Sequence, residues 1–257
     1  MSELPYTISF GNPDDPLLLC LHGIGSCADA FIDQAPLAER LGRYVVAWDA
    51  PGYRHSPDPV TPYRLDDWAD DAARIIEALG HDGGADLLGV SWGGVTSTRV
   101  ALRRPELVRT LILADSSVGS GTSERNATAM RGRADAVTEL GLDEFARSRA
   151  PMLFGEDAPQ SVIDLSAKYM VDSVRMPVYQ WACNSMAEAD HTELLPTLEM
   201  PSLVIVGDQD RITAPKLSQR LADGLANSQL VTIAGAGHLA NQEQPAAFND
   251  AVAHFLG

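Results

Sequence analysis

Short apolar runs alternate with longer amphipathic stretches along this chain, and this alternation restricts the fold more than any other feature. The runs are Leu17–Leu21, Val45–Trp48, Leu87–Val90, Leu111–Ala114, Leu203–Val206 and Leu230–Ile233. Nearly continuous apolar runs of this length indicate strands buried on both faces. In the stretch Leu65–Leu79, Trp68, Ala72 and Ile76 recur at helical spacing. Strands that alternate with helices predict an α/β domain with a mostly parallel sheet flanked by helices.

The alternation stops between about residues 116 and 196, where helical patterns separated by prolines replace the strand signals. We therefore expect an α/β core from 1–117 and 197–257, with a helical cap over 118–196. Five of the seven methionines fall in this insertion. Flexible and aromatic apolar side chains suit the wall of an apolar pocket, so Met152, Met176 and Trp181 are predicted to line one. The alternative is that they only pack the helices together.

Charge and cysteine content exclude several classes of function. Asp and Glu total 35 against 19 Lys and Arg, and the resulting formal charge of −16 would repel nucleic acid and anionic membrane surfaces. No run of eighteen apolar residues occurs and the first residues lack a signal-peptide pattern, so we expect a cytoplasmic protein. Three cysteines without CxxC spacing fit neither a disulfide framework nor a zinc site.

A candidate nucleophile lies in the segment Gly89–Gly93, which reads G-x-S-x-G around Ser91. A predicted strand precedes the segment and a predicted helix, Val95–Leu102, follows it. A tight strand-turn-helix needs small flanking residues, and such a turn exposes the serine hydroxyl at the helix N-terminus. The motif alone is weak, because a serine that merely caps the helix would look the same.

A serine hydroxyl becomes a good nucleophile only when a base takes its proton. Of the six histidines, His238 alone combines a glycine-rich loop after the last predicted strand with the expected position late in the chain. A carboxylate should then orient this histidine, and the strand before it runs into Asp208 and Asp210. We favour Asp210, with Asp208 forming the turn. Asp115 is a more distant alternative.

Attack on a carbonyl also requires donors for the developing oxyanion. The backbone N–H of Trp92 directly follows the candidate nucleophile. The glycine-flanked loop after the first strong strand is expected to present the N–H of Ile24, and His22 in that loop is predicted to organise the turn rather than transfer protons.

The order of these features resembles the α/β-hydrolase superfamily over essentially the whole chain. Asp49–Ser56 is similar to the D-x-P-G-x-G-x-S loop of these enzymes, except that Arg54 replaces a glycine, and 238–245 is similar to the tail of 3-oxoadipate enol-lactonases. The resemblance implies a helical cap, no metal or organic cofactor, and the triad Ser91, Asp210 and His238. A serine at the turn between strand and helix argues against the chemistry of those relatives that use a carboxylate as the nucleophile.

The leading functional hypothesis is hydrolysis of a small carboxylic ester or lactone through an acyl-enzyme on Ser91. Two alternatives stay open: hydrolysis of a carbon–carbon bond in a ring-fission product by the same triad, and a ligand-binding protein that has lost turnover. An anionic substrate would need a cationic partner. Arg54 is one candidate, and the insertion supplies others: Arg125, Arg131, Arg133, Arg147, Arg149, Lys168 and Arg175.

Overall fold

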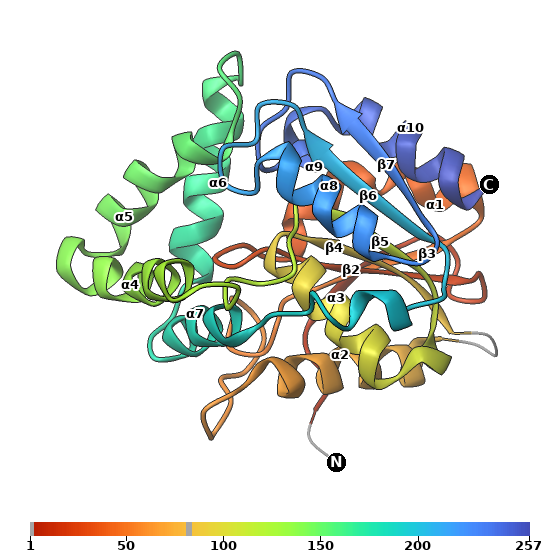
Figure 1. Ribbon diagram of the computed structural model, residues 1–257, viewed down its shortest axis with the longest axis horizontal. Coiled ribbons are helices and arrows are strands. Elements are labelled where there is room, and N and C mark those ends of the chain that lie inside the picture. Colours follow the sequence, from red (N-terminus) through yellow and green to blue (C-terminus); the bar gives the residue numbers. More distant parts are fainter. Residues whose placement is uncertain (1–2, 81–83) are drawn as a thin grey trace.

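The computed structural model describes residues 3–80 and 84–257 and contains a seven-stranded sheet in the order β1-β3-β2-β4-β5-β6-β7 (Figure 1). The strands are β1 Thr7–Phe10, β2 Leu17–Leu21, β3 Tyr44–Trp48, β4 Ala85–Val90, β5 Val108–Ala114, β6 Ser202–Gly207 and β7 Ser228–Ile233. All neighbours from β3 to β7 pair in parallel. The predicted α/β-hydrolase fold with a mostly parallel sheet is therefore confirmed.

The strand β1 is absent from the sequence-based prediction. It pairs antiparallel with β3 at the edge of the sheet, with Thr7 opposite Trp48. None of its four residues is fully buried. An edge strand needs only one partner and little burial, so its residues do not form the apolar run that marks the other strands.

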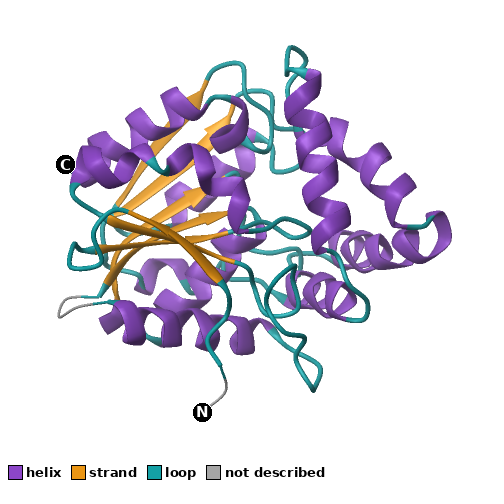
Figure 2. Ribbon diagram, turned by 180° about the vertical axis from the view of Figure 1, so that it is seen from behind, coloured by secondary structure: helices purple, strands orange, loops and turns teal. Residues whose placement is uncertain are grey.

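Two layers of helices cover the sheet, and Figure 2 shows the strands between them. The core helices are α1 Pro36–Leu41, α2 Leu65–Leu79, α3 Trp92–Arg103, α8 Pro215–Gly224, α9 Ala240–Glu243 and α10 Pro245–Leu256. Side chains alternate across β2: Leu19 packs with the apolar residues of α2 and α3, whereas Cys20 packs with those of α1 and α10. This burial on both faces explains why β2 is apolar throughout.

The chain between β5 and β6 contains four α-helices and no strand: α4 Glu124–Leu140, α5 Leu142–Arg149, α6 Gln160–Ser173 and α7 Val178–Glu188. These helices of the insertion lie together at one side of the sheet (Figures 1 and 2). Short 3-10 helices complete the fold at Ala28–Gln34, Pro105–Leu107, Ala150–Leu153 and Leu195–Thr197. Within the described ranges, every helix is too short or too polar to span a bilayer.

Candidate active site

Ser91 occupies a sharp turn between β4 and α3. Its backbone has φ 55° and ψ −117°, a conformation that L-residues rarely adopt. The two flanking glycines are required by close backbone contacts. A Cβ on Gly89 would lie 2.4 Å from the carbonyl carbon of Gly93, and a Cβ on Gly93 would lie 1.9 Å from the oxygen of Leu21. The glycines therefore permit the turn that presents the Ser91 hydroxyl.

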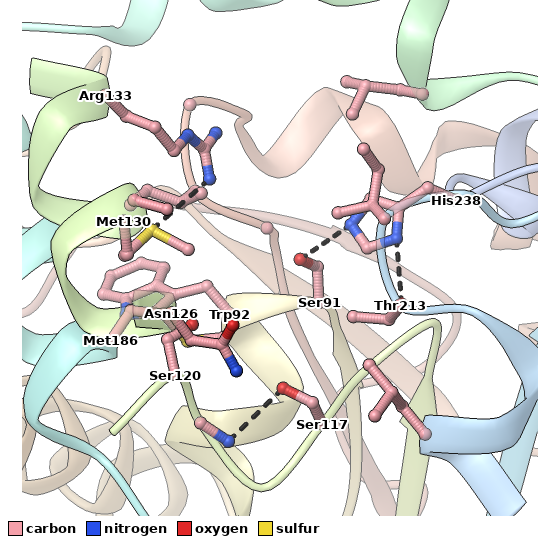
Figure 3. Close-up of a pocket in the computed structure, with 18 of the residues that line it drawn as sticks. Ser91, Trp92, Ser117, Ser120, Asn126, Met130, Arg133, Met186, Thr213 and His238 are labelled. Carbon is pink, nitrogen blue, oxygen red and sulfur yellow. Dashed lines mark hydrogen bonds between the residues drawn. The ribbon is translucent and has the colours of Figure 1, made fainter. Parts of the chain in front are cut away.

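Ser91, His238 and Asp210 form a continuous hydrogen-bonded chain. His238 Nε2 lies 2.9 Å from Ser91 Oγ, and its Nδ1 lies 2.9 Å from Asp210 Oδ2 (Figure 3 shows the Ser91–His238 contact). Because an ionised carboxylate only accepts hydrogen bonds, Nδ1 carries the hydrogen and Nε2 is left to accept from the serine. His238 and Asp210 are both buried. All three residues follow the carboxyl ends of parallel strands, which meet at one edge of the sheet.

The surroundings of Asp210 keep it ionised. Burial raises the pKa of this carboxyl, but the hydrogen bond and charge of His238, together with hydrogen bonds from Thr213, hold the pKa below its ordinary value. Its Oδ1 accepts the backbone N–H groups of Ile212 at 2.7 Å and Thr213 at 2.9 Å. The carboxylate is thus locked in the orientation that faces His238.

The two competing acids contact backbone groups instead of His238. Asp208 Oδ1 accepts the N–H of Gly235 at 2.8 Å. This hydrogen bond links the turn after β6 to the turn after β7. Asp115 is fully buried and accepts the N–H groups of Gly207 at 2.9 Å and Ala240 at 3.0 Å. Burial and the neighbouring charge of Asp210 raise the pKa of Asp115 well above its ordinary value.

The loop that carries His238 is fastened to the insertion, a feature that sequence reasoning missed. The backbone N–H of His238 donates to Leu153 O at 2.8 Å. The buried Glu243 carboxylate accepts the N–H of Gly237 at 2.7 Å and that of Gly155 at 3.0 Å. Glu243 lies in the enol-lactonase-like tail, but only the tertiary structure shows what its carboxylate binds.

The two predicted oxyanion donors both line the cavity above Ser91. Trp92 is the first residue of α3, so its N–H has no acceptor within the helix. The loop that carries Ile24 lies against Ser91, because a Cβ on the adjacent Gly23 would be 3.3 Å from Ser91 Cβ. His22 shapes this loop: its Nε2 accepts the N–H of Ala50 at 3.0 Å, so its Nδ1 donates to Gly23 O at 2.8 Å.

A cavity of about 410 Å³ opens beside Ser91 and His238. The apolar part of its lining includes Met130, Leu153, Met170 and Met186 from the insertion. Among residues 3–80 and 84–257, no group of three or more His, Cys, Asp or Glu side chains is arranged to hold a metal ion.

The three residues predicted to line the pocket do not border this cavity. Met152 and Met176 are about half exposed, at 54% and 45%. Met152 precedes Leu153, which turns inward, and Met176 lies in the connection between α6 and α7. Trp181 is only partly buried and packs against the core. The sequence pattern predicts helical segments here but does not say which of their residues face inward.

Arg54 does not reach the cavity either. It forms an ion pair with Asp29 at 2.5 Å, and its backbone keeps a glycine-like φ of 39°. The loop therefore retains a backbone conformation typical of glycine at this position. The arginine side chain is bound by Asp29, which lies outside the insertion.

A seven-stranded, mostly parallel sheet with a hydrogen-bonded Ser-His-Asp set at its carboxyl edge defines a hydrolase of the α/β type. The sequence profile of the family described as alpha/beta hydrolase fold matches residues 16–245. The chain belongs to this family.

Several proteins of known or named activity are similar to this chain over most of its length. The chain is 32% identical to a 3-oxoadipate enol-lactonase 2 from Acinetobacter baylyi, an alignment that covers 95% of this chain and 90% of the relative. It is 29% identical to a 2-hydroxymuconate semialdehyde hydrolase from a Pseudomonas species, with 93% and 86% covered. Among solved structures, a thermophilic esterase from Thermogutta terrifontis has a TM-score of 0.87 and 28% identity, with 98% and 92% covered.

Proposed function

We propose that this protein is a serine hydrolase that cleaves a small carboxylic ester or lactone. The observation that carries the proposal is the continuous chain Ser91–His238–Asp210, with both links at 2.9 Å, at the floor of a cavity. The similarity to an enol-lactonase and to an esterase supports ester or lactone chemistry.

The proposed reaction begins when Ser91 Oγ attacks the acyl carbon while His238 Nε2 takes the hydroxyl proton. The tetrahedral oxyanion accepts hydrogen bonds from the N–H groups of Ile24 and Trp92. Collapse breaks the bond to the leaving oxygen, which receives the proton from His238, and leaves an acyl group on Ser91. Water then attacks this acyl-enzyme with His238 as base, and the carboxylic acid product departs. Asp210 stays ionised and stabilises the imidazolium in both steps.

The nucleophile can be tested with Ser91→Ala. This variant is expected to lose turnover of p-nitrophenyl acetate, and a phosphonate probe is expected to modify the peptide that contains Ser91 in the unaltered protein. Ser166→Ala is a matched control, because Ser166 also lines the cavity whereas the hydrogen bond of His238 Nε2 is made with Ser91. Full activity of Ser91→Ala, or labelling of another residue, would disprove the assignment.

A second candidate is hydrolysis of a carbon–carbon bond in a ring-fission product, supported by the similarity to 2-hydroxymuconate semialdehyde hydrolase. Parallel assays with short esters, lactones and vinylogous diketones separate the two candidates. Preferred cleavage of esters or lactones supports the first, whereas preferred cleavage of the diketones supports the second.

A further inference from the structure

The cavity has the opposite charge sign to the protein as a whole. The chain carries 35 acidic and 19 basic residues. Nevertheless, the residues that line the cavity include four arginines and, among the described residues, no Asp or Glu. Arg211 and Arg220 are exposed, whereas Arg133 on α4 and Arg149 at the end of α5 are partly buried. A small cavity with this lining attracts anions from water.

The protein satisfies the guanidinium groups of Arg133 and Arg149 only in part. The Nε of each guanidinium is buried and donates no hydrogen bond within the described structure. The described part of the chain also provides neither of them with an ion-pair partner within 4.0 Å. The side chains that face Arg133 are Tyr53, Tyr179, Cys183 and the Met130 sulfur, which lies 3.6 Å from an Arg133 nitrogen. These groups are neutral and leave the positive charge uncompensated.

Other partly buried arginines of the same chain do have acidic partners. Arg43 and Arg109 share the buried Asp86 at 3.0 and 2.8 Å, and Arg54 binds Asp29. The absence of such a partner at Arg133 and Arg149 is therefore specific to the cavity. Burial and the neighbouring charge of Arg133 also lower the pKa of Arg149 to about 10, which leaves both groups charged at neutral pH. A partly buried pair of like charges is unfavourable until an anion joins it.

Figure 3 shows where this charge lies relative to the nucleophile. Arg133 reaches from α4 into the cavity on the side opposite His238, with Ser91 between them. Met130, which precedes Arg133 by one turn, lines the cavity beside it. A substrate that places its acyl carbon at Ser91 can thus extend a second group toward the arginines across an apolar stretch.

We propose that Arg133 and Arg149 form an anion subsite, and that the substrate is an ester or lactone that carries a free carboxylate at the end remote from the scissile bond. A guanidinium matches a carboxylate through two parallel hydrogen bonds. A carboxylate also carries a single charge, so it costs less to transfer into this methionine-lined cavity than a doubly charged phosphate does. The statement that the substrate is an ester or lactone rests on the proposed function, whereas the anion subsite does not.

Half-esters of dicarboxylic acids test the subsite directly. Monomethyl and dimethyl esters of succinic, glutaric and adipic acid share the methyl leaving group and the carbon chain, and they differ in whether the remote carboxyl group is free and charged or methylated and neutral. The unaltered protein is expected to show a kcat/KM for the best half-ester about 10- to 150-fold above that for its diester, the value of a hydrogen bond to a charged group. Arg133→Met and Arg149→Met are expected to remove most of this preference, and Arg133→Lys to restore part of it.

The matched control is Arg147→Met, which removes an arginine from the same helix as Arg149. Arg147 is 71% exposed and paired with Glu144, outside the cavity. This variant is expected to keep the half-ester preference. Circular dichroism of each variant verifies that it is folded, and the lysine variant keeps the test decisive if a methionine variant does not fold.

Binding to Ser91→Ala separates failure of the subsite from failure of the proposed reaction. Calorimetry is expected to detect the monomethyl ester but not the dimethyl ester, with loss of binding when Arg133→Met is added. If this result holds while the unaltered protein cleaves neither ester, the hydrolysis proposal fails and the subsite stands. Equal binding and cleavage of the two esters, or an unchanged preference in both methionine variants, would overturn the subsite. Tighter binding of inorganic phosphate than of the half-ester would also overturn the carboxylate assignment.

Discussion

The backbone of Ser91 predicts an unusual pair of stability changes. Ser91→Ala and Ser91→Gly both remove the hydrogen bond between Oγ and His238 Nε2, so a comparison between the two variants cancels that loss. What remains is the effect of a Cβ at φ 55° and ψ −117°. Glycine adopts this conformation without steric cost, whereas alanine does not.

The magnitude follows from two opposing contributions. Backbone strain at such a position costs about 1–3 kcal/mol for a residue with a Cβ. Glycine, in return, loses about 0.4–1 kcal/mol more conformational entropy on folding than alanine does. We therefore expect Ser91→Gly to be more stable than Ser91→Ala by about 1 kcal/mol, or about 2–4 °C in Tm for a chain of this length.

Thermal and urea unfolding, followed by circular dichroism, measure this difference. Ser97 provides the control, because it is fully buried within α3 and has ordinary helical geometry. There, the glycine variant is expected to be less stable than the alanine variant by about 1 kcal/mol. The reasoning would be refuted if Ser91→Gly were no more stable than Ser91→Ala, or if the two sites gave the same sign.

Two further predictions concern the carboxylate that is hydrogen-bonded to His238 and a buried histidine. Asp210→Asn is expected to lower kcat on the order of 10⁴-fold, because an amide does not hold the productive histidine tautomer. Asp208→Asn, which alters only the contact with Gly235, should lose far less in the same ester assay. Burial lowers the pKa of His191 to about 4 from 6.5. Between pH 6.5 and pH 4 the histidine is therefore protonated in the unfolded chain but neutral in the folded protein. The free energy of unfolding is unaffected by this histidine above pH 6.5 and decreases as the pH falls toward 4. His191→Leu should reduce the stability difference between pH 7 and pH 5 by about 2 kcal/mol in urea unfolding.

Each of these predictions has a clear contrary result. Equal losses in Asp210→Asn and Asp208→Asn would show that the 2.9 Å contact with His238 is not what orients the base. For His191, the exposed His254 on α10 is the control. If His254→Leu changed the pH dependence as much as His191→Leu, burial of His191 would not be the cause.

Sequence alone determined the features that depend on residues close together in the chain. The helical period of Leu65–Leu79 coincides with α2, and the six apolar runs coincide with β2 to β7. The segment Gly89–Gly93 predicted the tight turn at Ser91, because the contacts that exclude a Cβ there involve mainly the turn itself and the adjacent strand β2. Chain order then selected His238 and Asp210, since loops after parallel strands meet at one edge of the sheet.

Only the tertiary structure decided which residues of the insertion face the cavity beside Ser91. The sequence supplied seven cationic residues over 118–196, and the packing of α4 and α5 brought only Arg133 and Arg149 to the cavity. Met152, in the 3-10 helix after α5, and Met176, between α6 and α7, are instead about half exposed. The physical reason is that helical period specifies which residues share a face, whereas the direction of that face depends on how whole helices pack against one another and against the sheet.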